Sequence, residues 1–144
     1  MMNPNTTWLA SVSPSVLVAG GGALGAWLRY MISRIFATTM GPTAIAFPWA
    51  TLTANVLGCA AMGLLVGWLA RHGGGNDSLR LLLGVGVLGG FTTFSSFALE
   101  FAVFVERDQI GLAALYVAVS LAAGFAALFA GLWLAGLWLA RVAA

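Results

Sequence analysis

Uncharged polar side chains interrupt the long apolar stretches of this sequence, and they are the residues best suited to handle an ion. Asn55 carries two N–H donors and one acceptor oxygen in a stretch without charge. Hydroxyl groups follow in later stretches, at Thr93, Ser96, Tyr116 and Ser120. Neutral donors of this kind can replace part of the water shell of a small anion. They bind the anion weakly and one after another, which suits conduction. A plainer interpretation stays open, in which Asn55 only bonds a neighbouring helix.

Two phenylalanines lie close to these hydroxyls. Phe94 and Phe97 are three residues apart and share one face if the segment is helical. The edge of an aromatic ring is electropositive and can attract an anion. Ordinary packing of the two rings is the alternative.

Carboxylates are scarce where a cation carrier would need them. Residues 1–76 contain none, and Glu100 is the only one close to the interior of an apolar stretch. A cation carrier usually has a membrane-embedded acid. The donor set therefore favours an anion, with Glu100 near one end of the stretch that holds the phenylalanines.

The composition places these residues in a membrane. Of 144 residues, 61% are hydrophobic and 7% are charged, whereas a soluble domain has about 25% charged residues. A soluble monomer is therefore excluded. The formal net charge of +2 comes from two surplus arginines, so no nucleic-acid partner is indicated. With the single cysteine Cys59 and no nucleophile–base pair or phosphate loop, an enzyme is not expected.

Four charge-free stretches set the expected architecture. About 20 apolar residues suffice for a helix to cross the hydrocarbon core. We therefore predict an all-α membrane protein with one domain over 1–144 and four spans, near 15–36, 48–70, 79–104 and 110–140. The last span is expected to be shorter than its range.

The third span contains a weak point. Gly89 and Gly90 are followed by Thr92 and Thr93, and glycine pairs are poor helix formers. We predict a break near Gly89–Thr92, which would free backbone carbonyls able to bind a small cation. The alternative is a continuous helix whose glycines allow close packing.

The arginines hardly specify an orientation. Three stand on one side of the membrane (Arg71, Arg80 and Arg141), against Arg107, Arg34 and, if it lies outside the span, Arg29 on the other. Such a balance is compatible with insertion in both directions and with an antiparallel homodimer, although a small bias can also orient a chain.

The small-residue pairs Gly21/Gly25, Gly63/Gly67 and Gly86/Gly90 give weak support for association. Arg29 either attracts anions into a vestibule or extends to the membrane surface.

Three segments together resemble one family. They are GGALGAWLRY (21–30), TLTANVLG (51–58) and GGFTTFSSF (89–97), in this order along most of the chain. This pattern is similar to that of the Fluc (CrcB) fluoride channels, and the third segment is the most specific. The resemblance implies a dual-topology, antiparallel homodimer of four-helix subunits in the cell membrane. Such a dimer has two pores that export toxic fluoride passively and select against chloride.

The resemblance also implies roles for single residues. Asn55 would donate to fluoride, and Phe94 and Phe97 would turn their ring edges to the ion. Tyr116 and Ser120 would form a polar track on the last helix. Carbonyls at the break, from Gly89 and Thr92 of both subunits, would hold a central structural sodium ion, and Glu100 would stand beside the pore mouth. Ser96 stands where many members have threonine, and Gly124 shortens the track.

Two other functions stay open at this point. A small four-helix, dual-topology coupled transporter, similar to multidrug exporters, would need an embedded carboxylate in an early helix, and none precedes Asp77. A membrane scaffold without transport would need the glycine contacts but not Asn55 and the third segment.

Overall fold

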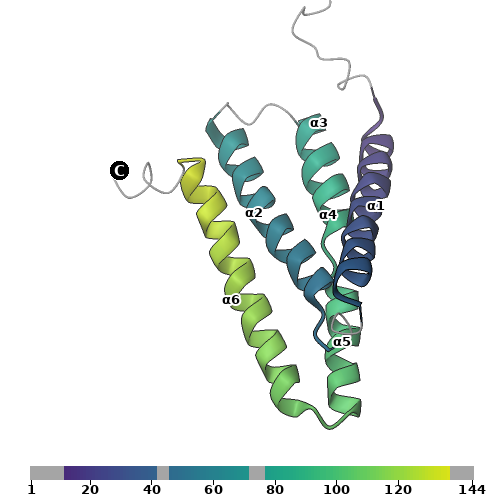
Figure 1. Cartoon of the computed structure of the whole chain (residues 1–144). Coiled ribbons are helices and arrows are strands. Elements are labelled where there is room, and N and C mark those ends of the chain that lie inside the picture. Colours follow the sequence, from purple (N-terminus) through teal and green to yellow (C-terminus); the bar gives the residue numbers. More distant parts are fainter. Residues whose placement is uncertain (1–11, 42–45, 72–76, 137–144) are drawn as a thin grey trace, which may run out of the picture.

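The computed structural model describes residues 12–41, 46–71 and 77–136, and within these ranges it contains helices and no strand (Figure 1). Four apolar passes are long enough to cross a membrane. Three of them are single helices: α1 (Pro14–Met40), α2 (Trp49–Arg71) and α6 (Ile110–Leu134). The third pass is divided into α3 (Asp77–Leu79), η3 (Arg80–Leu88), α4 (Gly89–Phe91) and α5 (Phe94–Glu106). The predicted all-helical fold with four membrane spans is confirmed.

The ends of the helices have local causes. Pro14 occupies the first turn of α1, where its missing N–H costs nothing, although the preceding Ser13 makes no side-chain cap. A tight turn follows α5, and Asp108 adopts a φ of 57° there. The last helix ends at Leu134 and is shorter than the range 110–140, as expected, because Gly136 with a φ of 74° turns the chain. Residues 137–140 of that prediction lie outside the described residues.

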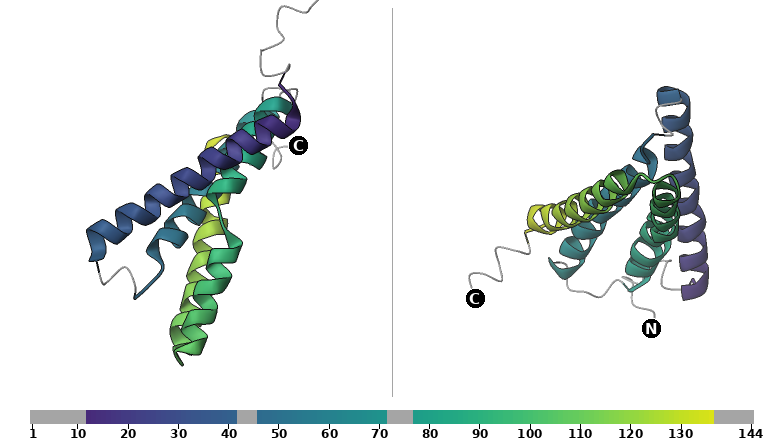
Figure 2. Two further views of the ribbon diagram at one scale, coloured as in Figure 1. Left: turned by 90° about the vertical axis from the view of Figure 1, so that its right-hand side faces the viewer. Right: turned by 90° about the horizontal axis from the view of Figure 1, so that it is seen from below.

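The passes are arranged as two closely packed pairs, with fewer contacts between the pairs than within them. α2 packs along α6, and α1 packs along η3 and α4 (Figure 1). α5, the last part of the third pass, continues downward beside the lower half of α6 (Figures 1 and 2). The pass is wider than an α-helix over η3, where hydrogen bonding is of the π type and the Gly89 amide donates to the Gly84 carbonyl.

Glycines allow the close approach within each pair. A Cβ atom on Gly21 would lie 3.0 Å from the Gly86 Cα, and one on Gly90 would lie 3.0 Å from the Gly22 Cα. Between α2 and α6, a Cβ on Gly63 would lie 3.1 Å from the Gly131 Cα. The small-residue pairs that the sequence suggested for association therefore serve contacts inside one chain.

The buried core is small and lies where α2, α5 and α6 meet. Leu52, Phe104, Ala113 and Tyr116 form it, and Tyr116 is fully buried. Many large apolar side chains elsewhere are exposed, among them Trp27, Leu99 and Phe125. In a membrane protein such surfaces contact lipid or another membrane-embedded chain.

We predict that the α1–η3 contact tolerates a methyl group at one glycine and not at another three residues away. A Cβ on Gly25 would collide with the Val87 carbonyl and lie 2.8 Å from the Phe91 amide, whereas one on Gly22 meets only the Gly86 carbonyl at 4.0 Å. Gly25→Ala should therefore destabilise the protein by about 1–3 kcal/mol. Gly22→Ala, the matched control, should leave the thermal midpoint in detergent close to wild type. Equal midpoints for both variants would contradict the packing described.

Candidate functional site

The third pass breaks at two threonines. Thr92 has φ −79° and ψ 156°, and Thr93 has φ −150° and ψ 118°, so both are extended. The predicted weak point is thus correct to within a few residues, but Gly89 and Gly90 remain helical, and Gly90 makes a close contact with α1. Both sequence interpretations hold in part, because Gly90 packs against α1 and the chain leaves the helix directly afterwards.

Hydroxyl groups take part in the backbone hydrogen bonding at the break. The Thr92 hydroxyl donates to the Leu88 carbonyl at 2.9 Å, and the same carbonyl still accepts from the Thr92 amide at 3.0 Å. The Thr93 hydroxyl accepts from the Ser96 amide at 3.2 Å and so caps α5. It also donates to the Ser96 hydroxyl at 3.1 Å and lies 3.3 Å from that of Ser95. Threonine and serine compete with the helical ladder in this way, which explains the place where the helix ends.

The side-chain amide of Asn55 holds the open backbone. Its Oδ1 accepts from the Thr93 amide at 2.8 Å, and its Nδ2 donates to the Thr93 carbonyl at 3.2 Å. Asn55 therefore satisfies both polar groups of one extended peptide residue. The sequence left open that Asn55 bonds a neighbouring helix. Asn55 does bond the third pass, but its partner is the extended backbone at the break and not a regular helix.

Two backbone carbonyls lose their usual donors as a result. In a continuous α-helix the Thr93 amide would donate to the Gly89 carbonyl, and the Ser96 amide would donate to that of Thr92. Both amides donate to side chains here, to Asn55 and to Thr93. Carbonyls released by a broken membrane helix are suitable ligands for a small cation. In the described part of the chain, no group of three acidic, histidine or cysteine side chains offers another metal site.

A cavity of about 260 Å³ lies beside the break. α2, α6 and the start of α5 converge on it, and none of its lining residues is charged. The lining comprises Asn55, Cys59, Thr92, Thr93, Phe94, Phe97, Ser120, Leu121 and Gly124. Five residues proposed from the sequence for an ion pathway thus lie together: Asn55, Thr93, Phe94, Phe97 and Ser120.

The two phenylalanines have different surroundings. Their ring centroids are 5.7 Å apart with the planes inclined by 40°. Phe97 packs against the core, with its ring centroid 5.0 Å from that of Tyr116. Phe94 is 80% exposed. One ring is therefore fixed by the chain itself, and the other projects from its surface.

The two residues predicted to form a polar track on the last helix, Tyr116 and Ser120, lie in different surroundings. Ser120 lines the cavity, and its buried hydroxyl has no hydrogen-bond partner within the described structure. An unpaired buried hydroxyl is unfavourable, so this position favours a polar ligand. Tyr116 points elsewhere: its hydroxyl donates to Glu100 Oε2 at 2.6 Å.

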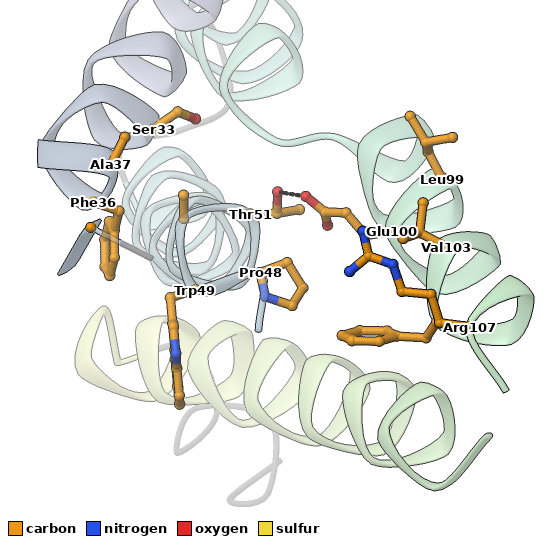
Figure 3. A pocket seen from close by; sticks show the side chains of 13 residues that line it. Ser33, Phe36, Ala37, Pro48, Trp49, Thr51, Leu99, Glu100, Val103 and Arg107 are labelled. Carbon is orange, nitrogen blue, oxygen red and sulfur yellow. Dashed lines mark hydrogen bonds between the residues drawn. The ribbon is translucent and has the colours of Figure 1, made fainter. Parts of the chain in front are cut away.

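Glu100 joins three elements at the lower end of the fold. Its other oxygen, Oε1, accepts from the Thr51 hydroxyl at 2.6 Å (Figure 3). Glu100 and Thr51 line a larger cavity of about 580 Å³ together with Arg107. Sequence reasoning missed Thr51, although it lies one helical turn before Asn55 and could have been assigned to the same face of α2.

Arg29 lies at the other side of the break. Its Nε donates to the Gly90 carbonyl at 3.4 Å, and the side chain is half-buried. A cation at the end of α4 interacts favourably with the carbonyls there. Two roles were considered for Arg29 from the sequence, attraction of anions into a vestibule and extension to the membrane surface. Neither predicted this contact.

Comparison with known proteins connects this site to a family. The family model "CrcB-like protein, Camphor Resistance (CrcB)" matches residues 16–132. A fluoride-specific ion channel FluC from Novosphingobium aromaticivorans is 56% identical over 121 residues, covering 84% of this chain and 94% of the relative. The FluC channel of Sphingopyxis alaskensis is 48% identical, with 78% and 86% covered. That of Phenylobacterium zucineum is 50% identical, with 83% and 93% covered.

The matched region contains the second and third passes, the first and fourth passes except two residues at their outer ends, and every residue of the break and its cavity. The relatives are named as ion channels and not as enzymes. The chain is thus a multi-pass protein of the plasma membrane that belongs to the CrcB (FluC) family.

Proposed function

We propose that this protein is a fluoride channel that lets the ion leave the cell passively and so relieves its toxicity. The observation that carries the proposal is the cavity beside the break, where an amide, hydroxyl groups and two aromatic rings meet without a charged side chain. The relatives named as fluoride-specific channels support the choice of ion.

The chemistry follows from the donors available. Asn55 Nδ2 has two N–H groups, and its bond to the Thr93 carbonyl uses one of them. We assign the second to fluoride, together with the unpaired Ser120 hydroxyl. The ring edges of Phe94 and Phe97 add weak attraction. Such contacts compensate for lost water without the strong trapping that a full positive charge would cause.

A second copy inserted in the opposite direction completes this proposal. Phe94 is largely exposed, so a single chain leaves one wall of the path incomplete. The described arginines near the membrane surfaces are evenly divided, with Arg71 and Arg80 at one end and Arg34 and Arg107 at the other. An antiparallel homodimer would bring two cavities together and therefore two pores.

A structural sodium ion is the remaining part of the proposal. The carbonyls of Gly89 and Thr92 are those whose helical donors are taken by side chains. Two such pairs, one from each copy, would give four oxygen ligands at the centre of the dimer. The bound ion would supply a fixed positive charge that joins the two breaks.

Fluoride efflux from proteoliposomes tests the function. Vesicles loaded with potassium fluoride should release it rapidly once valinomycin allows potassium to follow, and vesicles loaded with chloride should not. The coupled-transporter alternative is not favoured, because no carboxylate lines the cavity and the relatives are named as channels. Release that required a proton gradient, or equal release of chloride, would contradict the proposal.

Asn55→Asp should lower fluoride flux by about tenfold or more, since each 1.4 kcal/mol corresponds to a factor of ten. The substitution removes both N–H donors and places a carboxylate in the path. Cys59→Ala, one turn away in the same cavity wall, is the matched control and should conduct nearly as wild type. Wild-type flux in a folded Asn55→Asp protein would remove this amide from the pathway.

Phe94→Ile and Phe97→Ile should each reduce flux severalfold, because a branched alkyl group lacks the electropositive ring edge. Only Phe97→Ile should also lower the thermal midpoint of solubilised chains, because Phe97 packs on Tyr116 whereas Phe94 is exposed. Phe125→Ile, an exposed ring on α6 outside the cavity, is the control for aromatic loss. Unchanged flux in both cavity variants would leave these rings with a packing role only.

A further inference from the structure

An apolar groove of about 590 Å³ opens at the end of the molecule opposite Glu100. It lies between the last turns of α2, the start of the third pass and the end of α6. Its walls are almost entirely aliphatic and aromatic: Leu64, Leu65, Trp68, Leu79, Leu83, Leu134 and Ala135. The volume is within the range of about 300–1,000 Å³ that is usual for small-molecule sites.

One polar side chain, Arg71, completes the lining of this groove. Arg71 is the last residue of α2, and its guanidinium packs against Gly136, just beyond the end of α6. A side chain at position 136 would occupy the space that this guanidinium fills. The charge is therefore held by contacts with a second helix end at the rim of the groove.

The groove and its charge are arranged along the direction that a lipid takes in a membrane. Arg71 ends a helix that is long enough to span the bilayer, so it lies at the membrane surface, and the aliphatic walls extend from it towards the interior. Trp68, one turn before it and 42% exposed, is of the residue type that is enriched at this depth.

Charge supports an anionic occupant. Among the residues that the structure describes, no acidic side chain lines the groove, and Asp77 at the start of α3 is not part of its lining. Arg80 lines a neighbouring apolar cavity that shares Leu65 with this one, so a second positive charge stands at the same end of the molecule. A guanidinium offers paired N–H donors that match phosphate geometry.

We propose that this groove binds one phospholipid with a net anionic headgroup, its acyl chain along the aliphatic walls and its phosphate on Arg71. The site is separate from the cavity beside the break and shares no residue with it. It does not depend on fluoride conduction.

Native mass spectrometry of the purified, full-length protein tests this binding. The protein is supplied with equal amounts of phosphatidylglycerol and phosphatidylcholine that carry the same acyl chains. We expect phosphatidylglycerol to be retained about fivefold more, the preference that one basic residue at a membrane surface typically gives. Arg71→Gln should abolish that preference, and Arg71→Lys should keep part of it. Equal retention of the two lipids by wild type would overturn the proposal.

Two further variants distinguish the groove from general charge attraction. Arg34→Gln removes an exposed arginine near the other end and should leave the preference unchanged; a loss equal to that of Arg71→Gln would overturn the site. Leu83→Trp fills the groove while keeping the guanidinium, and it should displace phosphatidylglycerol. If Arg71→Gln does not fold, Leu83→Trp decides the outcome. Displacement of the lipid by inorganic phosphate alone would show an anion site without lipid specificity and would also reject the proposal.

Discussion

The pairing of the Asn55 amide with the Thr93 backbone is the interaction on which the rest of this structure depends. A helix that breaks inside a bilayer exposes N–H and C=O groups to hydrocarbon, and each unsatisfied group costs several kcal/mol. One asparagine on α2 satisfies both groups of Thr93, at 2.8 and 3.2 Å. The Thr93 hydroxyl satisfies the Ser96 amide within the third pass itself. The break is therefore maintained by specific polar partners and is not merely tolerated because glycines are near.

This pairing has consequences on both sides of the break. The helical segment before it stays with α1, where Gly90 packs on Gly22 and Arg29 bonds the Gly90 carbonyl. The segment after it departs towards α6 and carries Phe94 and Phe97 to the cavity. Asn55 is thus both a support of the backbone and a wall of the cavity. A substitution of Asn55 would change the backbone support and the cavity wall together, so its effect on flux is to be read beside a stability measurement.

Sequence reasoning predicted the four passes well, because charge-free length depends only on composition along the chain. It placed the break within a few residues, since glycine and threonine weaken a helix wherever they occur. It did not predict that the Tyr116 hydroxyl donates to Glu100 instead of lining the cavity. Nor did it predict that the Thr51 hydroxyl donates to the other oxygen of Glu100. Periodicity assigns residues to a face of their own helix, but the rotation of each helix against its neighbours decides which faces meet. The glycines make the close helix contacts that their spacing indicates, but spacing does not indicate the partner, which here is another helix of the same chain.

The two phenylalanines beside the cavity differ in their exposure. Phe97 is fixed by Tyr116, whereas Phe94 extends from the chain beside Thr93 and the unpaired Ser120 hydroxyl. A cavity with polar groups that opened sideways to lipid would be unfavourable, because hydrocarbon offers no hydrogen bonds. The glycine surfaces that often join membrane helices are already used within the chain. Association through the face that bears Phe94 would cover this opening, and a balance of arginines at the two ends would be compatible with a second copy in the opposite orientation.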